Sequence, residues 1–94
     1  MQYSSRFDKP FVKRLKKLKK DSPELFKRLM KKISEIVENP EHYKPLTKVL
    51  KGKRRAHVGS FVIIFMLNEK NGEVVFLEFD HHDKVYRLGL VPKK

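Results

Sequence analysis

The spacing of apolar residues changes about halfway along this 94-residue chain, and that change limits the folds it can adopt. Before Asn39-Pro40 the apolar side chains recur with the period of amphipathic helices. After Pro45 they alternate or run together, which is typical of strands bounded by turns. Helices followed by a meander of strands predict an α+β fold, with an N-terminal helical hairpin packed on a mostly antiparallel sheet.

Two helices are predicted in the first half. Asp8 can cap the first, and Pro10 falls in its first turn, where a missing N–H is harmless. Ser22-Pro23-Glu24 gives a second start signal, and that helix should end at Asn39-Pro40. The residues with helical spacing that we expect in the core are Phe11, Leu15 and Leu18, then Leu25 or Phe26, Leu29, Met30, Ile33, Ile36 and Val37.

The second half predicts the sheet. Arg54–Val58 should be a strand that ends at the tight turn Gly59-Ser60, and the apolar run Phe61–Leu67 indicates a central strand covered on both faces. Asn71-Gly72 is a hairpin signal that leads into a strand over Glu73–Asp80. In that strand, alternation puts Val75, Leu77 and Phe79 on one side and Val74, Phe76, Glu78 and Asp80 on the other. Two shorter elements are also predicted, a weak first strand at Tyr3–Phe7 and a last strand or turn at Val85–Val91.

The size and composition indicate one domain over residues 1–94. There is no cysteine, so the chain has neither disulfides nor a thiolate metal site. The N-terminus lacks the apolar run of a signal peptide, and the longest apolar run is too short for a membrane span. We therefore expect a cytoplasmic protein with no membrane partner and no cofactor.

The charge distribution favours a polyanionic partner. The net charge is +12, whereas solubility of a small domain needs only about 2–8 units. No acidic residue occurs between His42 and Asn68, although a lysine-rich solvated surface is the alternative explanation. The residues predicted to bind RNA are Lys44, Lys48, Lys51, Lys53 and Arg54, together with His81.

Histidines near the ends of two strands suggest chemistry on RNA. Alternation puts Arg55 and His57 on the solvent face of their strand, and the neighbouring strand ends at His81-His82. One histidine can take the proton of a 2′-OH while another protonates the departing 5′ oxygen. Nearby cations can stabilise the charge that builds on phosphorus, and Tyr86 can stack on a base.

Plainer interpretations exist for several of these residues. Successive residues of a strand alternate in direction, so only one of His81 and His82 should enter the groove. Tyr86 can simply pack at the sheet edge. A metal site built from Asp80, Asp83 and the histidines is disfavoured, because no metal-ligand spacing occurs and cations surround the segment.

The chain resembles the RelE/ParE toxin superfamily over nearly its whole length. The resemblance lies in four segments taken in order: residues 11–18, the loop from Asn39-Pro40 to Gly52, residues 54–65, and residues 81–86. It implies the fold of microbial ribonucleases and a ribosome-dependent endonuclease of messenger RNA that a cognate antitoxin silences. By resemblance, the catalytic residues fall on Arg55, His57, His82 and Tyr86.

One departure from the superfamily pattern leaves other functions open. Many members carry an arginine shortly after the turn glycine, and here that position is Val62, so Lys53, Arg54 or Arg55 would have to supply the charge. A ParE-like inhibitor of DNA gyrase is the first alternative. A non-catalytic or degenerate nucleic-acid-binding member of the same fold is the second.

Overall fold

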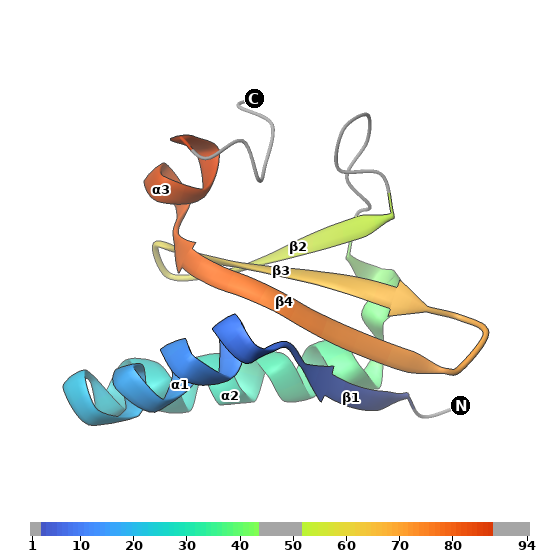
Figure 1. The fold of residues 1–94 in the computed structure, drawn as a ribbon, viewed down its shortest axis with the longest axis horizontal. Coiled ribbons are helices and arrows are strands. Elements are labelled where there is room, and N and C mark those ends of the chain that lie inside the picture. The colour runs from blue at the N-terminus through green and yellow to red at the C-terminus, as the bar shows by residue number, and fades with distance from the viewer. Residues whose placement is uncertain (1–2, 44–51, 88–94) are drawn as a thin grey trace.

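A computed structural model describes residues 3–43 and 52–87, the last two by their backbone alone. The elements are β1 (Ser4–Phe7), α1 (Lys9–Asp21), α2 (Pro23–Glu38), the short 3-10 helix η1 (Pro40–His42), β2 (Lys53–Val58), β3 (Phe61–Asn68), β4 (Glu73–His81) and α3 (His82–Arg87). The hairpin of α1 and α2 lies on one side of the sheet, and α3 stands at the end of β4 on the other side (Figure 1). The α+β fold with an N-terminal helical hairpin is thus confirmed.

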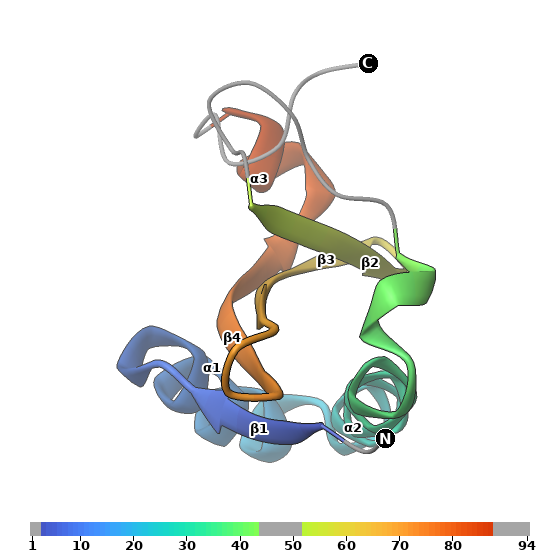
Figure 2. The ribbon, with the colours of Figure 1, turned by 90° about the vertical axis from the view of Figure 1, so that its right-hand side faces the viewer.

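The sheet has the strand order β1-β4-β3-β2 and a strong twist (Figure 2). β1 runs parallel to β4, and the other neighbours are antiparallel, so the mostly antiparallel sheet is confirmed. β3 lies between two strands, as the apolar run predicts, and its residues 62–65 are all buried. Met66 is 38% exposed, so the predicted cover on both faces does not extend along the whole run. The hairpin signal is confirmed as well, since Gly72 adopts a positive φ of 61° between β3 and β4.

The helix boundaries follow from proline and from backbone capping. Both helices have a proline in their first turn. The Ser22 N–H donates to the Leu18 carbonyl at 2.8 Å, and the Asn39 N–H donates to the Glu35 carbonyl at 3.1 Å. Asp8 occupies the predicted N-cap position, but its side chain makes no capping hydrogen bond. Backbone geometry therefore sets these ends.

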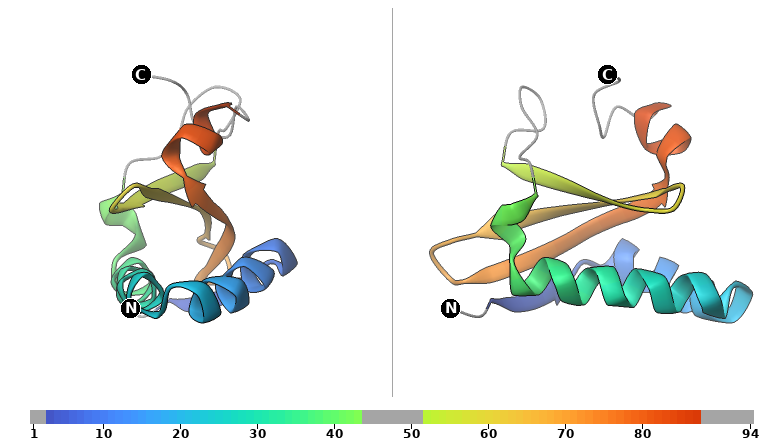
Figure 3. Two further views of the ribbon diagram at one scale, coloured as in Figure 1. Left: turned by 90° about the vertical axis from the view of Figure 1, so that its left-hand side faces the viewer. Right: turned by 180° about the vertical axis from the view of Figure 1, so that it is seen from behind.

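The core lies between the helical hairpin and the sheet (Figure 3). α2 buries Leu29, Ile33 and Ile36, which follow one another at i, i+4 and i+7. α1 contributes Phe11, which is fully buried. One apolar stripe from each helix thus covers the face of the sheet that is turned toward the helices.

A β-bulge breaks the predicted alternation along β4. Phe65 of β3 pairs with Phe76, whereas its neighbour Ile64 pairs with Glu78, so Leu77 is the extra residue. The alternation reverses at this point, and the sides predicted for the residues beyond Leu77 are wrong.

The bulge places two aromatic rings on the same side of the sheet. The ring of Phe11 lies 5.5 Å from that of Phe76 and 4.9 Å from that of Phe79, measured between centroids. Both phenylalanines therefore pack against α1, and Asp80 turns to the opposite face. Aromatic contacts of this kind contribute about 0.5–1.5 kcal/mol each beyond simple burial.

Two further predictions are wrong. Met30 remains 36% exposed, because the buried stripe of α2 runs through its neighbour Leu29 and leaves Met30 at the margin. The segment predicted as a last strand or turn at Val85–Val91 is helical as far as Arg87, and its remainder lies outside the described residues. Asp83 in the first turn of α3 favours the helix through its charge. In the described part of the chain, no helix is long and apolar enough to cross a membrane.

The contrast between Leu29 and Met30 can be tested directly. We expect Leu29→Ala to lower the free energy of unfolding by about 2–5 kcal/mol, because it leaves a cavity in the core. Met30→Ala should cost less than about 1 kcal/mol, because its side chain is at the surface. Urea unfolding followed by circular dichroism measures both changes. Equal losses in the two variants would contradict this core.

Candidate functional site

The face of the sheet turned away from α1 and α2 carries His57 of β2, one of the predicted catalytic residues. Ala56 and Val58 are 3% and 5% exposed on the helix side, so His57 projects from the opposite side and is exposed, as alternation predicts. In register, His57 pairs with Val62 of β3, which in turn pairs with Asp80 of β4. These residues form one row across the sheet. We call this surface the outer face.

His82 lies close to His57 at the end of this row. It is the first residue of α3, and its N–H donates to the Ser60 carbonyl in the β2–β3 turn at 2.9 Å. Its Nδ1 lies 3.1 Å from Oδ1 of Asp83. The hydrogen bond to the turn holds the start of α3 beside the end of β2, and His82 is near enough to His57 to influence its protonation.

The surroundings of His57 keep its imidazole neutral. Partial burial lowers the pKa of His57 below its ordinary value of 6.5, and the charges of Arg55 and His82 lower it further. At neutral pH this side chain therefore carries a free nitrogen lone pair. A neutral imidazole can accept a proton, which is the requirement for a general base.

Asp80 ties the end of β4 to both neighbouring helices. Its Oδ2 lies 2.9 Å from Nη1 of Arg14 in α1 and 3.3 Å from Nζ of Lys84 in α3. Burial alone would raise the pKa of Asp80, but the His81 N–H and the charges of Arg14 and Lys84 outweigh burial and lower it. The carboxylate therefore stays ionised and holds three elements together.

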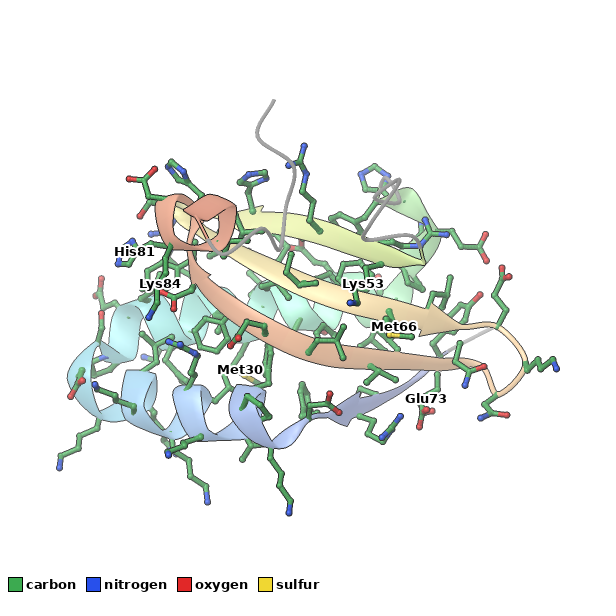
Figure 4. The ribbon with its side chains drawn as sticks, turned by 45° about the horizontal axis from the view of Figure 1, so that its top comes forward. Met30, Lys53, Met66, Glu73, His81 and Lys84 are labelled. Carbon is green, nitrogen blue, oxygen red and sulfur yellow. The ribbon has the colours of Figure 1, made fainter. Side chains whose placement is uncertain are left out.

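Two other cations lie on the outer face. Arg55 follows the same alternation as His57 and is half-buried. Lys53 pairs in register with Met66 of β3, and their side chains lie side by side on this face (Figure 4). Both cations are thus available along β2 on the side where His57 projects.

Two predicted RNA-binding residues project to the opposite side. Nη1 of Arg54 donates to the Tyr43 carbonyl at 2.7 Å, which ties β2 to the end of η1. The His81 ring packs 4.3 Å from the Phe61 ring, measured between centroids, beside a cavity that Leu18 of α1 also lines. The structure therefore does not bring Arg54 and His81 to the row of His57 and His82.

Some predicted residues cannot be located. Lys44, Lys48 and Lys51 lie outside the described residues, as does the side chain of Tyr86, whose backbone belongs to α3. Among the residues that are described, no three His, Asp or Glu side chains gather as they would around a metal ion.

Val62, which stands where the resemblance leads one to expect an arginine, is fully buried. α3 contacts β3 and β4, and its Val85 is fully buried as well. Valine at this position thus belongs to a small apolar contact on the outer face. This position therefore supplies no charge to the outer face.

Sequence reasoning missed Arg14 and Lys84, the partners of Asp80. Lys84 stands four residues after Asp80, a spacing that pairs charges within a helix, but Asp80 is in a strand and so gave no signal. Arg14 is one of many cations on α1, and nothing in its local sequence distinguishes it.

The chain is similar to known proteins over most of its length. The model of the family described as "ParE toxin of type II toxin-antitoxin system, parDE" matches residues 6–86. A protein of Methanocaldococcus jannaschii named "Putative toxin RelE4" is 43% identical over 74 residues, which cover 78% of this chain and 79% of that protein. An uncharacterized protein of Methanosarcina mazei is 34% identical over 87 residues, or 92% of this chain and 96% of its own.

Solved structures share the fold at low sequence identity. The RelBE2 toxin–antitoxin complex of Mycobacterium tuberculosis contains a chain with a TM-score of 0.75 at 24% identity, covering 87% of this chain and 93% of that one. The archaeal RelE–RelB complex of Pyrococcus horikoshii gives a TM-score of 0.67 at 22% identity, covering 86% of this chain and 96% of that one.

The closeness of the two histidines predicts a coupled titration. We expect His82→Gln to raise the pKa of His57, because the substitution removes a positive charge that disfavours protonation of His57. Titration of the imidazole proton signals by NMR measures this pKa. His42→Gln, a change at an exposed histidine of η1, should leave it unaltered. An unchanged pKa of His57 in His82→Gln would place the two rings too far apart to cooperate.

Proposed function

We propose that this chain, which belongs to the RelE/ParE superfamily of type II toxin–antitoxin toxins, is an endoribonuclease that cuts messenger RNA on the ribosome and so inhibits translation. The observation that carries the proposal is the meeting of His57 and His82 on the outer face, with Arg55 on the same strand as His57. A base, an acid and a cation are each able to accelerate cleavage through the 2′-OH.

The proposed reaction is a transesterification within the RNA. His57 takes the proton of the 2′-OH, and the 2′ oxygen forms a bond to phosphorus while the bond to the 5′ oxygen breaks. His82 gives a proton to the departing 5′ oxygen, so the products are a 2′,3′-cyclic phosphate and a 5′-hydroxyl. The lowered pKa of His57 suits it to the role of base, because its ring is neutral near pH 7.

The cations of β2 would stabilise the phosphorane-like transition state. Arg55 lies two residues from His57 on the same face, and Lys53 lies two residues further along. Preorganised positive charge of this kind acts where negative charge develops during the reaction. Lys44, Lys48 and Lys51 are proposed to hold the RNA, and Tyr86 to stack on a base next to the cut.

We further propose a cognate antitoxin as partner. The solved relatives include toxin–antitoxin complexes, and an active RNA cutter needs a silencer in its own cell. An acidic, partly disordered antitoxin would complement the net charge of +12 and mask the basic surface.

A gyrase inhibitor is the second candidate. The matching family model carries the ParE name, and the arginine expected near Val62 is absent. A ParE-like toxin would need no pair of histidines, so the same experiment distinguishes the two functions.

The test is cell-free translation with ribosomes and purified protein, with mapping of new 5′ ends in the messenger. We expect cuts at codon positions, and a loss of roughly 100-fold or more in His57→Ala with His82→Ala, since each acid–base group contributes about 10²–10⁴-fold. His42→Ala is the matched control and should cut normally. An intact messenger with normal translation would refute the nuclease and leave gyrase inhibition, measured by DNA supercoiling, as the function to examine.

A further inference from the structure

A basic groove lies next to His57, on the other side of β2 from β3. β2 is the outermost strand at this end of the described sheet, and α2 runs beneath it and beneath the β2–β3 turn (Figure 3, right). A cavity of about 350 Å³ opens between them. Its lining from α2 is Arg28, Lys31, Lys32 and Glu35, and its lining from β2 and the turn includes His57 and Gly59. We call this cavity the α2–β2 groove.

Two of the three cations in the α2–β2 groove have no acidic partner among the residues that the structure describes. Lys32 pairs with Glu35, with 3.3 Å between Nζ and Oε1. Arg28 and Lys31 make no ion pair with any described residue, and both are exposed. The groove thus presents two uncompensated positive charges beside the imidazole that we propose as the base.

The guanidinium of Arg28 lies beside the β2–β3 turn. Gly59 has a φ of 59°, in the left-handed region that favours glycine, and a Cβ at that position would be in ordinary van der Waals contact with Arg28, 3.4 Å from Nη2. The turn calls for glycine because of its φ, and the nearness of Nη2 places the guanidinium at the turn. Arg28 and His57 therefore line the same cavity although they belong to different elements.

We propose that the α2–β2 groove binds the RNA phosphate that flanks the scissile one, with Arg28 and Lys31 as its ligands. The flanking position rests on the proposed function, because it takes His57 as part of the cleavage site. The binding of a single-stranded phosphate backbone does not depend on it. The RNA would run from His82 past His57 and over the edge of β2 toward α2.

Phosphate is the ligand class that fits these side chains. A guanidinium offers a planar fork of donors that matches phosphate oxygens, and a lysine adds a point charge. The groove is open, so a continuous backbone can pass through it rather than end in it. The groove also supplies positive charge from α2, whereas the buried Val62 of β3 supplies none.

The experiment measures binding without cleavage. The probe is a short fluorescent oligoribonucleotide with 2′-O-methyl groups throughout, which lacks the attacking hydroxyl. Its affinity is measured by fluorescence anisotropy over a series of salt concentrations. The variant is Arg28→Gln with Lys31→Gln, and the matched control is Lys16→Gln with Lys20→Gln, which removes two exposed charges from α1.

We expect the Arg28/Lys31 variant to bind about tenfold more weakly or worse at about 0.1 M salt. The slope of log affinity against log salt should fall by about 0.7, because the variant loses one phosphate contact and a single strand contributes about 0.7 per phosphate. The control should change affinity less than about threefold, since charges more than roughly 10 Å away are largely screened at this salt. Both pairs are at the surface, so folding should be unaffected.

Equal affinities in the two variants would overturn the proposal. The proposal would also fail if the Arg28/Lys31 change weakened the binding of an acidic peptide such as polyglutamate but not that of the oligonucleotide. The groove would then serve an acidic protein partner. Loss of binding in the Arg28/Lys31 variant, in a protein that cuts no messenger, would support the phosphate site while the nuclease function fails. The two proposals can therefore fail separately.

Discussion

The bulge at Leu77 is the constraint on which the geometry of the outer face depends. It inserts one residue into β4, so that Phe76 and Phe79 both reach Phe11 instead of facing opposite ways. The same insertion turns Asp80 to the outer face, level with His57. A strand with regular alternation would have exposed one aromatic ring and buried the carboxylate among apolar side chains, at a cost of several kcal/mol. Hydrophobic packing on one face thus decides which side chains appear on the other.

Electrostatics then fixes the position of α3. Asp80 is 8% exposed, and its carboxylate is compensated by Arg14 and Lys84 rather than by water. The ion pair between Lys84 and Asp80 and the hydrogen bond from the His82 N–H to the Ser60 carbonyl anchor the first turn of α3 to the sheet. The chain has a net charge of +12, so its cations repel one another. The buried carboxylate of Asp80 nevertheless holds two of them, Arg14 and Lys84, close together. The contacts of α3 with Asp80 and Ser60 thus set the position of His82.

The parts of the fold that depend on local spacing could be predicted from the sequence. The buried stripe Leu29, Ile33 and Ile36 follows helical periodicity, and the solvent side of β2 follows from Ala56 and Val58. Predictions failed where a tertiary contact overrides the local pattern. A bulge cannot be read from the alternation that it breaks, and the side of Met30 depends on how far α2 is rotated against the sheet.

The candidate site likewise combines residues that local sequence spacing brings together with a residue that only the tertiary fold brings to them. His57 and Arg55 share a face because they are two residues apart in one strand, so the sequence suffices to pair them. Arg28 reaches the same site from α2, and its pattern within that helix is the ordinary one of a solvated cation. Gly59 gives no signal for Arg28 either, because its positive φ by itself favours glycine. Val62, on the strand next to β2, is fully buried beneath the contact between α3 and the sheet, so it adds no positive charge to the site. A helix beneath an edge strand can supply it without disturbing the apolar contact at Val62, which links the composition of the groove to the packing of the outer face.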